Sequence, residues 1–209
     1  MRCLVRFLFW VAAVALSSSA FAGNFSFTGN FQNDNDLQEF FFTISNPSIV
    51  TLQTWSFAGG TNANSQLIPA GGFAPVLALF DPSGTIVGNF DQGGVAPNNC
   101  APRNIDGASH LCLDAYLLDN LGAGNYTLVL SQQDNVPLGN TFGDGYQHDG
   151  DPNFAGGFND FGLQRNSSWA VDIDIVDTAV SAPEPSSALI LLCGLACLAC
   201  VRFKHAFRG

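Results

Sequence analysis

The stretch "SSWAVDIDIV", residues 167–176, decides how the chain is expected to fold. Apolar and acidic side chains alternate along it with a period of two residues. Successive side chains of a β-strand point to opposite faces, so this period is typical of a strand with one buried and one exposed face. The side chains expected to face a core are Trp169, Val171, Ile173 and Ile175, and those expected to face water are Asp172 and Asp174.

The same alternation recurs through most of the preceding sequence. Residues expected to share an apolar face are Phe25, Phe27 and Phe31 in "NFSFTGNF", and Phe40, Phe42 and Ile44 in "QEFFFTIS". Further strand-like runs occupy residues 48–57, 74–80, 85–90 and 125–132, with turn clusters such as "DPSG" and "LGAGN" between runs. Because helical periodicity is nearly absent, we expect an all-β, antiparallel β-sandwich or jelly-roll-like single domain.

The first 22 residues have the three parts of a secretory signal peptide. Arg2 and Arg6 give a positive start, residues 7–16 are apolar, and "AFA" at 20–22 is a small-x-small cleavage site. We therefore expect export, with cleavage after Ala22. An uncleaved membrane helix is the alternative, but the apolar run is short for one.

The last residues, 182–209, combine a short motif, an apolar run and a basic end. The 14 apolar residues 188–201 would form a helix of about 21 Å, against a bilayer core of about 30 Å. Flanking residues extend the helix to about 27 Å, so we expect a membrane helix whose basic end stays in the cytoplasm. The motif consists of Pro183, Glu184 and Pro185, and the basic end of Arg202, Lys204 and Arg208.

In this order the three parts resemble the PEP-CTERM sorting signal of Gram-negative bacteria. The resemblance implies recognition by an exosortase, a membrane cysteine protease-transpeptidase. It implies a transient anchor in the inner membrane and cleavage near the motif, which would release the body or transfer it to the cell surface; a permanent anchor is the alternative. We therefore divide the chain into a signal peptide (1–22), a body (23–181) and a sorting signal (182–209).

The body is strongly acidic. All of the chain's 17 acidic residues except Glu184 lie in it, against only two arginines, Arg103 and Arg165, which leaves a balance of −14. Such a surface repels nucleic acid and attracts hard cations such as Ca²⁺. Charge of this kind also keeps an exported domain soluble.

Two cysteines, Cys100 and Cys112, lie in the body. An oxidising compartment allows one disulfide between them. That bond would close a 13-residue loop, which is worth about 3 kcal/mol of stability in the chain-entropy model. A zinc site is less favoured, because two thiols without nearby paired histidines make a poor ligand set.

Three motifs of the body, in order, resemble bacterial pre-peptidase C-terminal-type β-sandwich domains. They are "NDNDLQEFFFTI" (33–44), "PVLALFDPSGTIVG" (75–88) and "LGAGNYTLVLS" (121–131). The chain departs from that pattern by three long insertions, at 58–74, 91–111 and 135–164. The resemblance implies an accessory, non-catalytic sandwich and leaves its ligand open.

Two acidic segments are candidate calcium sites. "NDND" at 33–36 presents alternate side-chain oxygens in a tight turn, and residues 139–162 add carboxylates among glycines and aromatic rings. The candidate ligands are Asp34, Asp36, Asp144, Asp149 and Asp151. The alternative for the turn is an Asx-rich turn whose side chains cap their own backbone.

The aromatic rings of residues 139–162 allow two interpretations. Rings exposed beside carboxylates would suit a sugar-binding surface. Rings tucked under the loop would form a satellite core, and we favour this second interpretation. The rings are those of Phe142, Tyr146, Phe154, Phe158 and Phe161.

Sequence motifs of catalysis are missing from the body. It has no Gly-x-Ser-x-Gly or His-Glu-x-x-His, and only His110 and His148 could serve as neutral-pH bases. We therefore expect a non-enzymatic, exported protein of the cell surface or extracellular matrix, associated with exopolysaccharide and biofilm, with no cofactor other than Ca²⁺. A calcium-dependent carbohydrate-binding module is the alternative, and a glycoside hydrolase with paired carboxylates is a second one.

Overall fold

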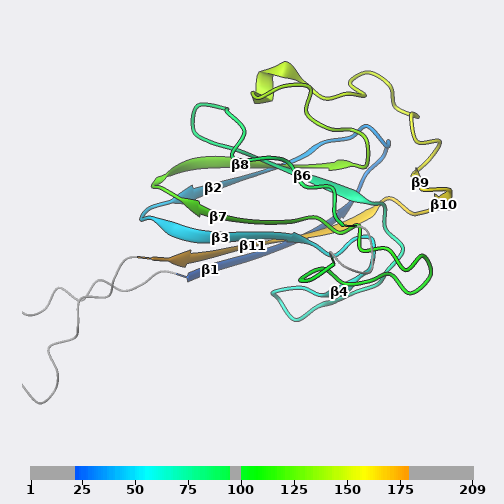
Figure 1. Cartoon of the computed structure of the whole chain (residues 1–209), viewed down its shortest axis with the longest axis horizontal. Helices are drawn as coiled ribbons and strands as arrows, with labels where there is room; N and C mark the ends of the chain where they lie inside the picture. The colour runs from blue at the N-terminus through cyan, green and yellow to red at the C-terminus, as the bar shows by residue number, and fades with distance from the viewer. Residues whose placement is uncertain (1–21, 95–99, 179–209) are drawn as a thin grey trace, which may run out of the picture. The chain divides into compact units, whose positions relative to one another are not determined.

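Figure 1 shows the chain as a computed structural model, which describes residues 22–94 and 100–178. The signal peptide up to residue 21 and the whole sorting signal lie outside the described residues. Within the two described ranges, no helix is both long enough and apolar enough to cross a membrane.

The regular structure of the described residues is almost entirely β. The long strands are β1 (Ala22–Asn30), β2 (Gln38–Ile44), β3 (Ser48–Thr54), β6 (Pro75–Phe80), β7 (Tyr116–Leu121), β8 (Gly124–Gln132) and β11 (Ser168–Asp177). The two-residue strands are β4 (Gly60–Thr61), β5 (Leu67–Ile68), β9 (Asn159–Asp160) and β10 (Leu163–Gln164), and a 3-10 turn, η1, spans Phe142–Asp144.

The long strands form two sheets that lie one above the other (Figure 1). The larger sheet has the order β1-β11-β3-β7 and the smaller sheet the order β2-β8-β6. Every neighbouring pair in both sheets is antiparallel. The expected all-β, antiparallel architecture is confirmed.

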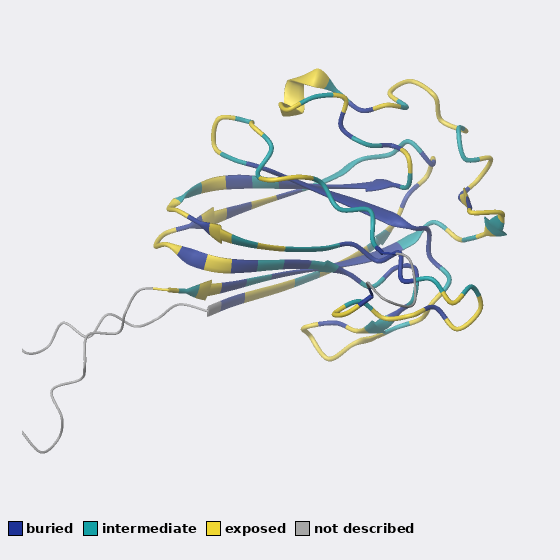
Figure 2. Cartoon of the chain, in the orientation of Figure 1, coloured by how far each residue is buried: buried dark blue, intermediate teal, exposed yellow. Residues whose placement is uncertain are grey.

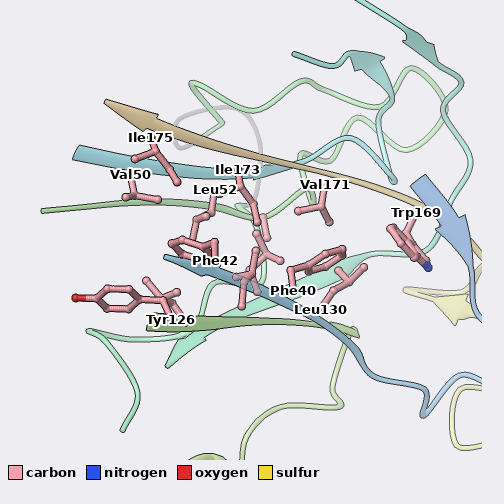
Figure 3. Packing of buried hydrophobic residues seen from close by; sticks show 14 of the residues in the cluster. Phe40, Phe42, Val50, Leu52, Tyr126, Leu130, Trp169, Val171, Ile173 and Ile175 are labelled. Atoms are coloured by element: carbon pink, nitrogen blue, oxygen red, sulfur yellow. The ribbon is translucent and has the colours of Figure 1, made fainter. Parts of the chain in front are cut away.

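The core lies between the two sheets, and β11 contributes to it as its alternation predicts (Figure 3). Trp169, Val171, Ile173 and Ile175 are all at most 8% exposed. From the facing sheet come the buried side chains of Phe40, Phe42, Ile44, Leu128 and Leu130. The ring of Phe40 meets the Trp169 indole edge to face, with 5.7 Å between centroids, a favourable arrangement for two aromatic rings.

The predicted face of β1 is only half covered. Phe25 and Phe27 point the expected way but remain 41% and 38% exposed, because β1 is an edge strand of its sheet. Phe27 still packs on Phe40, with ring centroids 4.9 Å apart. Burial along this strand therefore depends on its position in the sheet as well as on its alternation.

Two other expectations are wrong. Residues 85–90 form no continuous strand; Thr85 and Ile86 make isolated bridges, and the run stops at Gly88, whose φ is +65°. Asp172 does not face water but is 3% exposed. Its carboxylate accepts hydrogen bonds from the Trp55 indole at 2.6 Å and from the Ala63 amide at 2.8 Å, because the hairpin β4–β5 folds over it.

Part of the outer face of the smaller sheet, over β6 and the end of β8, is covered as well, whereas Phe41 on the outer face of β2 is 75% exposed. Every residue of β6 is buried (Figure 2). The cover over its outer face comes from Leu37, from the segment that holds Ile86 and Phe90, and from Tyr146 in residues 133–158, which we call the covering loop. This loop contains most of the residues expected to carry chemistry.

Candidate functional site: carboxylates under the covering loop

Aromatic side chains of the covering loop pack against the smaller sheet. Tyr146 is 1% exposed and packs with Ala78, Phe80 and Val129 in a second hydrophobic cluster. The ring of Phe142 meets that of Phe80 at 5.4 Å. This is the satellite core that the sequence favoured over a sugar-binding surface.

The remaining three rings of the segment differ in exposure. Phe158 belongs to the main core and stacks on Phe73 at 5.4 Å. Phe154 stacks on the imidazole of His148 at 3.8 Å. Only Phe161 is largely exposed, at 62%, so a continuous aromatic platform is not formed here.

Three of the five candidate calcium ligands cap backbone amides of their own turn. Asp36 accepts from the Gln32 and Asn33 amides at 2.6 and 2.9 Å. Asp144 accepts from the Thr141 amide at 2.9 Å, and hydrogen bonding from Thr141 lowers the pKa of Asp144. Asp149 accepts from the Tyr146 amide, also at 2.9 Å. For Asp36 the geometry is that of the Asx-rich turn weighed above.

Of the other two candidates, Asp151 contacts its own turn, and only Asp34 reaches another segment. Asp151 lies 3.6 Å from Nδ1 of His148. Asp34 is 1% exposed, and its Oδ2 accepts from the amides of Ala155 and Gly157 at 2.9 and 3.4 Å. The acidic turn and the covering loop therefore do meet, and Asn35 adds two hydrogen bonds, to the His148 carbonyl and from the Asn135 side chain. Among the five candidate ligands, however, only Asp34 joins the two segments.

Among the residues that the structure describes, no three His, Cys, Asp or Glu side chains are grouped so that they could hold a metal ion. The five candidate carboxylates are therefore not gathered into one ligand set. Calcium binding stays a prediction.

Asp34 is near enough to buried Asp160 for its charge to raise the pKa of Asp160. The Oδ1 of Asp34 is buried and has no hydrogen-bond partner within the described residues, and the same holds for Oε1 of Gln132. The Gln132 amide donates to Asp160, whose other oxygen accepts from the Ala74 amide at 2.9 Å. All three side chains are at most 3% exposed. We call Asp34, Gln132 and Asp160 the buried carboxylate cluster.

The buried carboxylate cluster contains two carboxyl groups and no positively charged side chain. Burial is the main reason that the pKa of Asp160 rises to about 6, and the charges of Asp134 and Asp34 raise it further. The positive charge of Arg165 lowers the pKa of Asp160, although the ion pair of Arg165 is with Asp106. A buried carboxylate with an unpartnered oxygen is costly unless a proton or a cation joins it.

Both arginines of the body are already engaged. Arg165 pairs with Asp106 at 2.9 Å, with both side chains at most 7% exposed, and its guanidinium lies 3.9 Å from the centre of the Phe57 ring. Arg103 pairs with Asp91 at 2.6 Å. The other carboxylates of the body therefore have no arginine partner, and several accept from uncharged donors such as backbone amides, hydroxyls, the Trp55 indole and the Gln132 amide.

Asp172 and Asp174 are the two carboxylates that alternation puts on one face of β11. Asp172 is fully engaged with Trp55, Ala63 and Ser26. Burial, followed by the charge of Asp172, raises the pKa of Asp174. The arrangement holds the hairpin β4–β5 against the sheet.

Cys100 and Cys112 form the expected disulfide. Sequence reasoning did not select Gln132, Asp160 or Asp114 as site residues. Asp160 does lie in the acidic segment 139–162, but its partner Ala74 is 86 residues away, so no local spacing could reveal the pairing.

No family model matches the chain, and no curated protein does either. Twelve chains of solved structures match. One is a periplasmic lysozyme inhibitor of g-type lysozyme, PliG, from Aeromonas hydrophila, with 12% identity over 78% of this chain and 92% of that chain. The TM-score is 0.31, and a likeness at that level carries no argument about function.

Proposed function

We propose that the chain is an exported, non-catalytic β-sandwich protein that an exosortase processes and delivers to the cell surface or extracellular matrix, where it associates with exopolysaccharide. The proposal rests on the resemblance of residues 182–209 to a sorting signal and on the secretory features of residues 1–22. The acidic, all-β body is consistent with a protein that works outside the cell.

One structural observation carries the proposal. Ala22 pairs with Val176, so the two ends of the body are neighbours at the same end of one sheet. The expected cleavage after Ala22 falls at the first residue of β1, and Pro183 follows the last residue of β11, Asp177, by six positions. Both cuts would therefore fall outside the packed core.

The opposite end of the sandwich carries the hairpins β4–β5 and β9–β10 (Figure 1). A body held by its C-terminal end would thus leave those hairpins farthest from the point of attachment. This suits a protein that contacts material beyond the membrane.

The intact mass of the protein recovered from each cell fraction tests the proposal. For the unmodified protein we expect, in the surface or extracellular fraction, the mass of a chain that begins at Gly23 and ends near the Pro-Glu-Pro motif. Replacing Pro183, Glu184 and Pro185 together by alanine should leave the tail in place and the protein in the membrane fraction. A matched variant with Ser186→Ala and Ser187→Ala should be processed normally. Recovery of an untrimmed 209-residue chain from unmodified cells would refute the proposal.

A second candidate function, calcium-dependent carbohydrate binding, is favoured by the unpartnered Oδ1 of buried Asp34. Carboxylate and amide oxygens are the ligands that Ca²⁺ prefers. The residues that would hold it are Asp34, Asp160 and Gln132, in place of the five carboxylates suggested by spacing. Calcium there would tie the acidic turn to the covering loop.

A further inference from the structure

A cleft of about 320 Å³ opens beside the end of β1, away from the buried carboxylate cluster. Its walls come from β1, from the hairpin β4–β5 and from the start of β11. Its volume falls at the lower end of the range for small-ligand sites. The cleft lies at the end of the sandwich that carries the hairpins.

An indole side chain forms part of this cleft. Trp169 is 8% exposed and is held by the core rings of Phe31 and Phe40, at 6.3 and 5.7 Å between centroids. Its partner across the strands is Gly29, where a Cβ would come within 2.3 Å of the indole. The missing side chain at Gly29 therefore makes room for the ring beside the cleft.

The indole also has an unused hydrogen bond. Nε1 of Trp169 is a buried donor without an acceptor among the described residues. Figure 3 shows this nitrogen on the side of the ring that faces away from the labelled core residues. Because this nitrogen is buried, a ligand in the cleft could accept its hydrogen bond only if the indole shifts toward the cleft.

The other residues that line the cleft are uncharged, and they include both polar and apolar side chains. Thr28, Asn30 and Gln66 are exposed side chains with hydroxyl or amide groups, and Leu67 is 78% exposed. None of the ten lining residues is ionisable, although the body as a whole has 16 acidic side chains. A cation would find no carboxylate in the cleft, and an anion would be repelled by the surrounding acidic surface.

We propose that this cleft binds a segment of a neutral saccharide chain. Hydroxyls and amides can exchange hydrogen bonds with sugar hydroxyls, while the exposed aliphatic side chains of Leu67 and Pro69 suit the apolar faces of sugar rings. The inference rests on the proposed association with polysaccharide and assigns it to a site. Because the lining has no ionisable group and no metal ligand set, binding here needs no calcium and stays constant between pH 5.5 and 8.

Isothermal titration calorimetry on the full-length protein tests the inference, in a polyoxyethylene ether detergent that has no sugar headgroup. The probes are cellohexaose, laminarihexaose, maltohexaose and the producer's own exopolysaccharide, with hexagalacturonate as the anionic comparison. We expect at least one neutral probe to bind, equally well in calcium and in EDTA. Binding of none of the neutral probes, or a preference for hexagalacturonate, would overturn the inference.

Matched variants locate the site. Asn30→Ala and Gln66→Ala should each weaken binding by about three- to tenfold, the usual effect of losing one hydrogen bond. The controls are Asn24→Ala and Asn64→Ala. Asn24 lies on the same face of β1 as Asn30, and Asn64 lies in the same hairpin as Gln66, but neither residue lines the cleft. Both controls should bind like the unmodified chain, and unchanged melting temperatures would show that all four variants fold.

The two proposals can fail separately. If all four variants bind polysaccharide as tightly as the unmodified chain, the cleft is not the site, and the proposed function stands. If the intact mass shows no processing while the cleft variants lose binding, the cleft is the site, and the sorting proposal fails.

Discussion

The hydroxyl of Thr54 donates a hydrogen bond of 2.9 Å to Asp114 Oδ1, and both side chains are at most 1% exposed. The same Thr54 oxygen accepts from the Ala115 amide at 2.8 Å. Asp114 in turn accepts from the amides of Phe57 and Ala58. This pair therefore fixes the end of β3 and the turn that leads to the hairpin β4–β5.

Replacing Thr54 by valine should destabilise the protein by about 1–3 kcal/mol, because it leaves the buried Ala115 amide without its acceptor and removes one donor from the buried Asp114 carboxylate. Denaturant unfolding would measure the loss. Thr51→Val is the control, because Thr51 lies on the same strand but is only partly buried. Equal stabilities of the two variants would contradict the role given to the pair.

The free energy of unfolding should increase as the pH falls from 7 to about 5. Burial raises the pKa values of Asp114 and Asp160 to about 6, from 3.8. Between these values the folded state binds more protons than the unfolded state, so lowering the pH stabilises the fold. The gain should end near pH 4, below which stability falls, because hydrogen bonds and Arg165 lower the pKa of Asp106 despite its burial.

Melting temperatures recorded in EDTA across this pH range would check the expectation. Asp160→Asn should reduce the increase between pH 7 and 5, because one of the two titrating groups is removed. A stability that rises steadily from pH 5 to pH 7 would contradict the assignment.

Arg165→Gln should cost about 3–5 kcal/mol, because it leaves Asp106 buried without its partner. The loss includes the stacking of the guanidinium on Phe57. Arg103→Gln serves as the comparison, because its partner Asp91 is 21% exposed and water can replace the lost contact. Chemical denaturation should therefore show a smaller loss for Arg103→Gln, and the reverse order would be unexpected.

Calcium at a hundred times its dissociation constant should raise the stability by about 2.7 kcal/mol if Asp34 and Asp160 hold it. Differential scanning calorimetry with calcium and with EDTA would show the shift. Asp34→Asn should abolish the shift, whereas Asp144→Asn should keep it, because Asp144 only caps its own turn. The absence of a shift in the unmodified protein would remove the second candidate function.

Replacing both Cys100 and Cys112 by serine should lower the stability by about 2–4 kcal/mol, as expected for a bond that closes a short loop. Dithiothreitol should lower the melting temperature of the unmodified protein and leave that of the double variant unchanged. The oxidised protein should also be two daltons lighter than the reduced one, which mass spectrometry can read directly.

The alternation of side chains was sufficient to predict the β-architecture and the inward face of β11, because a period of two residues reflects local backbone geometry. It could not predict the partial exposure of Phe25 and Phe27, since that depends on which strands end up at the edges. Asp172 was misplaced for a related reason. The hairpin that buries it comes from residues more than a hundred positions earlier in the chain.

Spacing pointed to the acidic turn at 33–36 and to the segment 139–162 as calcium sites, and whether either binds calcium stays a prediction. The structure does bring Asp34 against the covering loop. Spacing could not separate Asp34 from Asp36, because one carboxylate turns outward to another segment and the other turns back to its own amides. Nothing in the sequence indicated that Gln132 belongs to the candidate site, because a glutamine at the end of a strand looks like any other strand residue.

The pairing of Ala22 with Val176 also determines how late in folding the larger sheet can form. β1 is the first strand to be synthesised, yet the neighbour that it hydrogen-bonds with, β11, is the last. The larger sheet therefore cannot close until almost the whole body is available, and such long-range pairing is intrinsically slow. If the chain is exported as proposed, this delay would keep it unfolded while it crosses the membrane, and the larger sheet would be completed on the far side.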